Sequence, residues 1–83
     1  MHTLFIDGSR YTSARELHLA LKRMLRLPEH YGCNADALYD CLSERRERVN
    51  LCILSRGNED VAAALRKCAM VVEDLGGEVK ELG

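Results

Sequence analysis

The apolar residues of this chain fall into two kinds of pattern, and each predicts one type of secondary structure. Residues 3–7 and 49–55 are mostly apolar or β-branched and are bounded by turn or polar residues, which is typical of strands. The stretch 49–55 is too apolar to be an exposed edge strand. Residues 78–82 can form a last short strand.

Between these strands, apolar residues return at intervals of three and four, which predicts three amphipathic helices. The first begins with a capping box of Ser13 and Glu16, and it ends near residue 26 because Pro28 disfavours helix at the preceding residue. Asn34 and Asn58 are good N-caps for the second and third helices, and a Gly-Gly pair ends the third. The predicted inward faces are Leu17, Ala20, Leu21, Met24 and Leu25 in the first helix, Leu38, Cys41 and Leu42 in the second, and Val61, Leu65, Cys68, Val72 and Leu75 in the third.

The predicted order is therefore β-α-α-β-α-β. Strands separated by helical crossovers run parallel, with right-handed connections. We expect an α/β fold in which a small three-stranded parallel sheet is packed with about three helices. The 83 residues contain no linker or internal repeat and predict a single domain over 1–83.

Composition narrows the functional classes. The formal net charge of −1 gives no general attraction to nucleic acid, a membrane surface or a basic partner. No apolar run approaches the roughly 18–20 residues needed to cross a bilayer, and the N-terminus lacks the apolar core of a signal peptide. We therefore expect a cytoplasmic protein whose four cysteines, an even number, are reduced.

The segment 27–42 carries the candidate functional chemistry. On a helix, Asp36 and Asp40 lie one turn apart on the same side. Beside Tyr31 and Tyr39, they make an acidic surface with aromatic anchors, as expected for a site that recognises a cationic pocket in another protein. Acidic residues on an outer helix face are also commonly just solvated, so the pattern locates a candidate surface without identifying its partner.

The same segment resembles the signature of the barstar family. Residues 27–32 read Leu-Pro-Glu-His-Tyr-Gly, and after Asn34 residues 36–42 read Asp-Ala-Leu-Tyr-Asp-Cys-Leu. The family pattern is Leu-Pro-Glu-aromatic-Tyr-Gly, Asn, then Asp-Ala-Leu-Trp-Asp-Cys-Leu. The resemblance extends more weakly over essentially the whole chain. It implies a stoichiometric inhibitor, not an enzyme, which is a monomer when free and forms a 1:1 complex with a secreted barnase-class ribonuclease or a related toxin.

The resemblance also implies roles for individual residues. Asp40 corresponds to the central phosphate mimic that pairs with active-site arginines and a histidine, and Asp36 to the family's second carboxylate. Gly32 and Asn34 match loop positions where the backbone approaches the enzyme closely. Tyr39 stands where the family has tryptophan. The predicted partner-binding residues are Asp40, Asp36, Tyr39, His30, Gly32, Asn34, Ala35, Tyr31 and Cys33.

Several positions depart from the family pattern. His30 replaces a tyrosine, Cys33 a glutamate and Ala35 a leucine. In the last helix, a glutamate that adds a further contact has no counterpart, its aligned place falling near Val71. Arginines at 45, 46 and 48 follow the second helix, where cations are favourable near a helix C-terminus.

Alternative chemistries find less support. Cys33 has no triad-like partners, so we predict no catalytic residue. His30 and Cys33 have the spacing of one metal-ligand pair but no second pair, so we predict neither a metal site nor another cofactor. Besides the inhibitor, two hypotheses remain. One is a barstar-like adaptor or immunity module for a non-ribonuclease partner. The other is an RNA-binding module, which rests on the arginines of the first helix and of residues 45–48 and needs a nucleic-acid partner that we do not expect.

Overall fold

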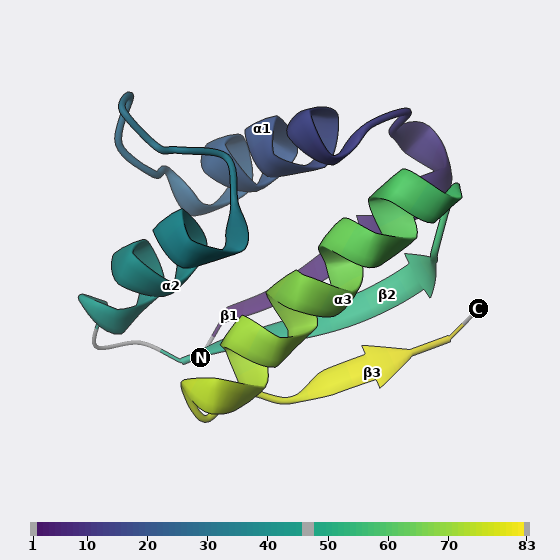
Figure 1. Ribbon diagram of the computed structural model, residues 1–83. Helices are drawn as coiled ribbons and strands as arrows, with labels where there is room; N and C mark the ends of the chain where they lie inside the picture. Colours follow the sequence, from purple (N-terminus) through teal and green to yellow (C-terminus); the bar gives the residue numbers. More distant parts are fainter. Residues whose placement is uncertain (1, 46–47, 83) are drawn as a thin grey trace.

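The computed structural model describes residues 2–45 and 48–82, and it confirms the predicted fold class (Figure 1). Three helices and a three-stranded parallel sheet occur in the predicted β-α-α-β-α-β order, with one additional short 3-10 turn. The elements are β1 (His2–Asp7), the 3-10 turn η1 (Gly8–Arg10), α1 (Ala14–Leu25), α2 (Ala35–Ser43), β2 (Val49–Ser55), α3 (Glu59–Asp74) and β3 (Val79–Glu81).

The sheet has the strand order β1-β2-β3, with β2 in the centre. Leu51 of β2 pairs with Leu4 on one side and with Val79 on the other, and both pairings are parallel. The central position of β2 agrees with its apolar sequence, since a central strand exposes neither edge to water.

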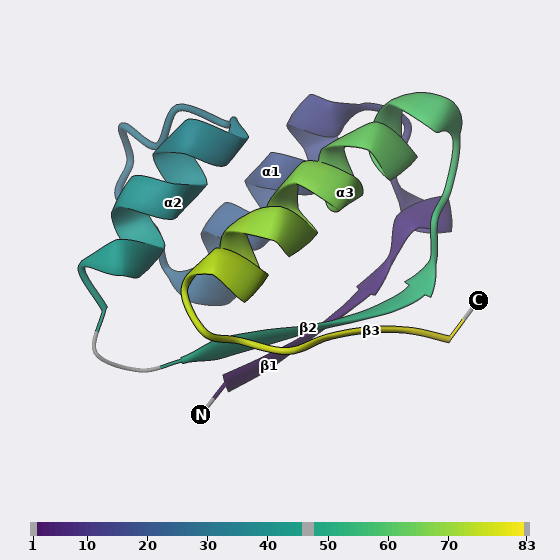
Figure 2. The same ribbon diagram turned by 60° about the horizontal axis from the view of Figure 1, so that its bottom comes forward.

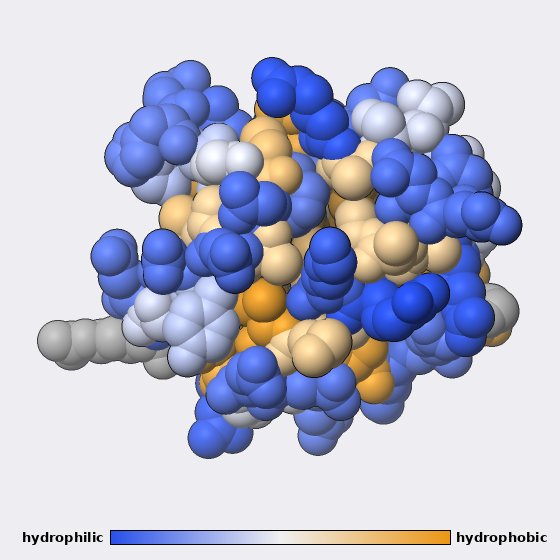
Figure 3. Space-filling model, viewed as in Figure 1, coloured by the Kyte–Doolittle hydropathy of each residue, from blue (hydrophilic) through white to orange (hydrophobic). Residues whose placement is uncertain are grey.

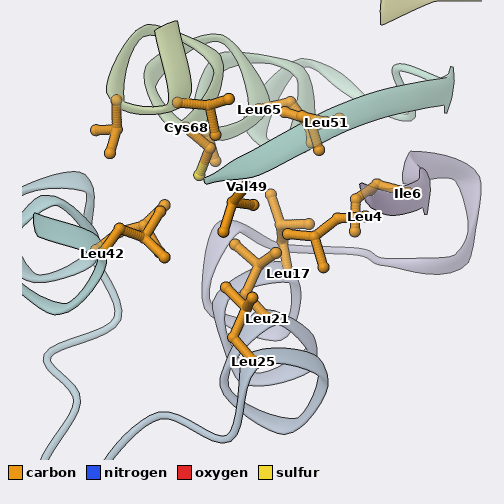
Figure 4. Packing of buried hydrophobic residues seen from close by; sticks show 14 of the residues in the cluster. Leu4, Ile6, Leu17, Leu21, Leu25, Leu42, Val49, Leu51, Leu65 and Cys68 are labelled. Atoms are coloured by element: carbon orange, nitrogen blue, oxygen red, sulfur yellow. The ribbon is translucent and has the colours of Figure 1, made fainter. Parts of the chain in front are cut away.

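All three helices lie on one face of the sheet (Figure 2). The strand residues that point toward the helices alternate with those that point away, as the period of two requires. Val49, which starts β2, lies among the leucines of α1, Leu42 of α2 and Cys68 of α3 (Figure 4). This single layer of helices holds most of the core. The buried cluster includes Leu4, Ile6, Leu17, Leu21, Leu25, Leu38, Leu42, Val49, Leu51, Ile53, Val61, Leu65, Cys68 and Val72.

The opposite face of the sheet has no described helix over it. Phe5 and Leu54 point to this side and are exposed. Cys52 also belongs to this face, and its side chain is buried. Its neighbours in register, Phe5 and Lys80, flank it on the adjoining strands.

Two details of α1 differ from the prediction. Met24 is 39% exposed instead of facing inward, whereas His18 is buried. The capping box is also only half formed. Ser13 accepts a hydrogen bond from the Glu16 backbone, but the Glu16 carboxylate turns to the backbone and hydroxyl of Thr12.

All four cysteines are free thiols. Cys68 lies deep in the core, where burial raises the pKa of its thiol to about 12. Cys41 is half-buried, and burial, with the nearby Glu44 and Asp40 carboxylates, raises its pKa as well. Neither thiol has the lowered pKa of a reactive cysteine.

Candidate partner-binding surface

The loop that precedes α2 is tightly organised. Leu27 donates its backbone N–H to the Lys22 carbonyl at 2.9 Å and buries its side chain, which closes α1. Arg26, just before it, is in the left-handed region with φ 53°, an uncommon conformation for a non-glycine residue. Tyr31 then donates its N–H to the Pro28 carbonyl at 3.0 Å and forms a turn. The loop backbone is thus fixed at both its beginning and its middle.

A buried side-chain hydrogen bond ties this loop to α1. The Tyr31 hydroxyl lies 2.7 Å from Nδ1 of His18, and the two rings are tilted, with centroids 5.9 Å apart. Burial lowers the pKa of His18 and raises that of Tyr31, so both groups are neutral at physiological pH. In either neutral tautomer the pair is satisfied, because Nδ1 can accept the phenolic hydrogen or donate its own hydrogen to the hydroxyl oxygen.

The position of Tyr31 corrects its predicted role. The tyrosine is only 7% exposed and belongs to the core cluster, so it cannot be an aromatic anchor at the surface. It positions the loop from beneath. Sequence reasoning had not assigned His18 any role, because its partner lies 13 residues away in the chain.

Asn34 joins the loop to α2. Its side-chain oxygen accepts the Ala37 backbone N–H at 2.7 Å, which is the predicted N-cap, and its amide donates to the Gly32 carbonyl at 3.3 Å. Cys33 between them has φ 54°, a second left-handed residue. One side chain therefore sets the direction of the helix relative to the loop.

The two carboxylates predicted for the site lie on the exposed side of α2. Asp36 is in the first turn and Asp40 one turn further, and both side chains are exposed. Among the residues that the structure describes, neither carboxylate takes part in an ion pair. Both are thus available to a partner. Leu38 and Leu42 occupy the opposite, buried side of the helix.

The remaining predicted site residues are spread around this helix. His30, Gly32 and Asn34 are exposed along the loop. Cys33 and Ala35 are half-buried and pack against the core, so they support the surface more than they present side chains to it. Loop and helix therefore form one surface, which we call the acidic face and define by Asp36, Asp40, Tyr39, Gly32, Asn34 and His30.

Next to the acidic face, a groove of about 460 Å³ separates α2 from α3. On the α2 side it is lined by the N-cap Asn34 and by Ala35, Asp36 and Tyr39. From α3 it is lined by Lys67, Met70, Val71 and Asp74. Figure 3 shows apolar surface reaching the outside between the two helices, bordered by hydrophilic side chains.

Sequence reasoning missed the part of this groove that α3 provides. The available signal was Met70, an apolar residue that lies off the inward stripe of α3 and is 59% exposed. Val71, near which the family's contact glutamate aligns, is buried.

The arginines after α2 are not equivalent. Arg45 donates from Nη1 to the Leu25 carbonyl at 2.7 Å, so its guanidinium closes the C-terminal end of α1. Arg48 is exposed, and Arg46 lies outside the described residues.

Residues 2–45 and 48–82 contain no group of three or more histidine, cysteine or acidic side chains arranged to hold a metal ion. Among the helices described, none combines the length and the apolar character required to span a bilayer.

These observations define a small α/β domain with an acidic helix, held in place by the loop before it. Residues 1–81 match the family described as Barstar (barnase inhibitor), and the chain belongs to that family. It is also similar to the protein named "Putative ribonuclease inhibitor YrdF" from Bacillus subtilis (strain 168), with 44% identity over 43 residues. The aligned stretch covers 52% of this chain and 47% of that relative, so the match spans about half of each protein.

Proposed function

We propose that this protein is a cytoplasmic inhibitor that occupies the active site of a secreted barnase-class ribonuclease in a 1:1 complex. Membership of the family described as barnase inhibitors supports this function, as does the similarity to a relative named for ribonuclease inhibition. The observation that carries the proposal is the pair of exposed carboxylates of Asp36 and Asp40 on one side of α2.

The chemistry of this pair suits a ribonuclease active site. An enzyme that cleaves a phosphodiester binds phosphate with cationic side chains, and a carboxylate can take the same place. Arginine is the best partner, because its planar fork donates two parallel hydrogen bonds to one carboxylate. In this mechanism Asp40 occupies the phosphate position, and Asp36 pairs with basic residues at the same cleft.

The rigid support of α2 favours tight binding. The Asn34 cap and the buried bond between His18 and Tyr31 hold the loop and helix before the partner arrives. Little ordering entropy is then lost on association, which is the main benefit of preorganisation. Exposed carboxylates also accelerate encounter with a basic cleft, and this effect weakens as salt screens the charges.

The test is a titration of barnase, cleaving RNA, with the wild-type protein and with Asp40→Ala. We expect a stoichiometric endpoint for the wild type. Removing one partner of a buried charge pair should weaken inhibition by about 2 kcal/mol or more, roughly 30-fold. Glu73→Ala removes an exposed carboxylate of α3 outside both the acidic face and the groove, so it should inhibit like the wild type.

Two outcomes would contradict parts of this proposal. If Asp40→Ala inhibits as well as the wild type, Asp40 does not mimic phosphate. If the wild type does not inhibit the enzyme, an adaptor or immunity module that binds a non-ribonuclease partner becomes the better candidate. The exposed His30, which replaces the family's tyrosine, favours that second candidate.

The RNA-binding hypothesis loses part of its basis. Arg45 donates to the end of α1, so this arginine of the 45–48 run is not free to contact RNA.

A further inference from the structure

Building on the proposed inhibitor function, we propose that the groove between α2 and α3 takes the place of the last-helix glutamate through which the family makes its further contact with the ribonuclease. In this arrangement the groove between the two helices receives an apolar side chain of the enzyme, flanked by a basic residue. Met70 and Tyr39 form its apolar walls, and the proposal makes Met70 a determinant of which ribonuclease is bound.

The groove is continuous with the acidic face. Asn34, Asp36 and Tyr39 belong to both, so a partner that covers Asp40 and its neighbours also reaches the edge of the groove. This continuity argues for the same partner and against an unrelated ligand.

The exposure of the groove walls indicates an interaction surface. Met70 is 59% exposed and Tyr39 42% exposed, and the two lie on opposite walls. Buried Val71 lies beside Met70 and adds apolar surface to the same groove. Tyrosine is enriched among the residues that dominate binding energy, and the flexible thioether of methionine adapts to irregular apolar surfaces.

The charges around the groove indicate what kind of partner residue lies beside the apolar side chain that enters it. The rim carries the carboxylates of Asp36 and Asp74 and one ammonium group, that of Lys67. The rim charge is therefore negative by one unit, which favours a basic residue of the partner at this place. A small-molecule ligand is a poorer occupant, because such sites are usually deeper and enclose most of the ligand.

The experiment measures dissociation constants for catalytically inactive barnase with two methionine variants and Asp40→Ala. Met70→Gln keeps the length of the side chain and its helix propensity but removes its apolar character. It should weaken binding by about 5- to 30-fold, the range expected when an apolar interface residue is lost. Met24→Gln makes the same change at a part-exposed position of α1 outside the groove, and its affinity should equal that of the wild type.

The pattern across the variants separates this inference from the proposed function. Loss of affinity in both Asp40→Ala and Met70→Gln, with Met24→Gln unchanged, supports the groove contact. If Asp40→Ala weakens binding while Met70→Gln does not, the inhibitor function stands and the groove contact is wrong. If the wild-type protein does not bind the enzyme, both are overturned. Thermal unfolding of each variant confirms that the fold is retained.

Discussion

At the scale of single residues, the pair of His18 and Tyr31 connects stability to the binding surface. Each ring carries a buried polar group, and the two groups form a hydrogen bond of 2.7 Å between His18 Nδ1 and the Tyr31 hydroxyl. A buried group left without its partner would cost about 1–3 kcal/mol. If the loop moved, both buried polar groups would lose their hydrogen-bond partner. The packing of the core therefore holds the loop in place.

This pair predicts how stability depends on pH. Burial lowers the pKa of His18 in the folded protein, whereas in the unfolded chain the imidazole titrates near 6.5. Below that pH the unfolded chain binds the proton more strongly, so the free energy of unfolding should decrease as pH falls from about 7.5 to about 5.5. Urea denaturation at several pH values measures this decrease.

Two variants identify the titrating group. His18→Gln can still accept the Tyr31 hydroxyl through its side-chain oxygen but does not titrate, so its stability should vary less over this range. His30→Gln, at an exposed loop position, should retain the wild-type dependence. The same pH dependence in His18→Gln as in the wild type would show that the decrease comes from another group.

At the scale of elements, the N-cap of α2 decides how the acidic face is presented. Asn34 makes two separate hydrogen bonds, one that caps the helix through Ala37 and one that holds the loop through Gly32. Asp36 and Asp40 are positioned by the start of this helix. A change at the cap therefore affects both the stability of the helix and the orientation of its carboxylates.

Substitutions at Asn34 should separate these two bonds. Asn34→Ala loses both and should lower the free energy of unfolding by about 1 kcal/mol, the usual value of an N-cap. Asn34→Asp keeps the oxygen that accepts from Ala37 but loses the amide that donates to Gly32. It should therefore remain close to the wild type in stability, which thermal or urea unfolding measures. Equal destabilisation of both variants would mean that the loop bond, and not the cap, is the important one.

The elements themselves could be predicted from sequence because their signals are local. The bounds of β2 match the predicted stretch 49–55, and Asn34 and Asn58 cap the helices as expected. Burial of individual residues depended on contacts between distant segments. His18 is buried through Tyr31, and Met70 is exposed because α2 and α3 leave a groove between them. The periodicity of a single helix predicts neither the burial of His18 nor the exposure of Met70.

At the scale of the whole molecule, the single layer of helices over the sheet determines where the binding surface lies. With α1, α2 and α3 on the same face, α2 is held at the side of α3, and the groove opens between them (Figures 1 and 2). The acidic face, the groove and the loop are therefore all carried by one side of a common core. The binding surface should tolerate changes that leave this packing intact.

Two glycines test whether folding and binding can be separated. Gly77 lies where α3 passes into β3, and a Cβ there would clash with the Val49 carbonyl oxygen and lie 2.8 Å from Cγ1 of Val72. Since the Val49 backbone belongs to the central strand and cannot move aside, Gly77→Ala should cost about 1–3 kcal/mol of stability. A midpoint of urea unfolding equal to that of the wild type would contradict this expectation.

Gly32 presents the opposite case. A Cβ there would lie 3.3 Å from the Ala37 Cβ and 3.6 Å from Nδ2 of Asn34, contacts that small shifts can accommodate. Gly32→Ala should therefore change the free energy of unfolding by only about 0.5 kcal/mol. Because Gly32 is exposed on the acidic face, the added methyl would stand where the enzyme approaches the backbone, and inhibition of barnase should weaken. If Gly32→Ala inhibits like the wild type, the loop does not make the close contact that the proposed complex requires.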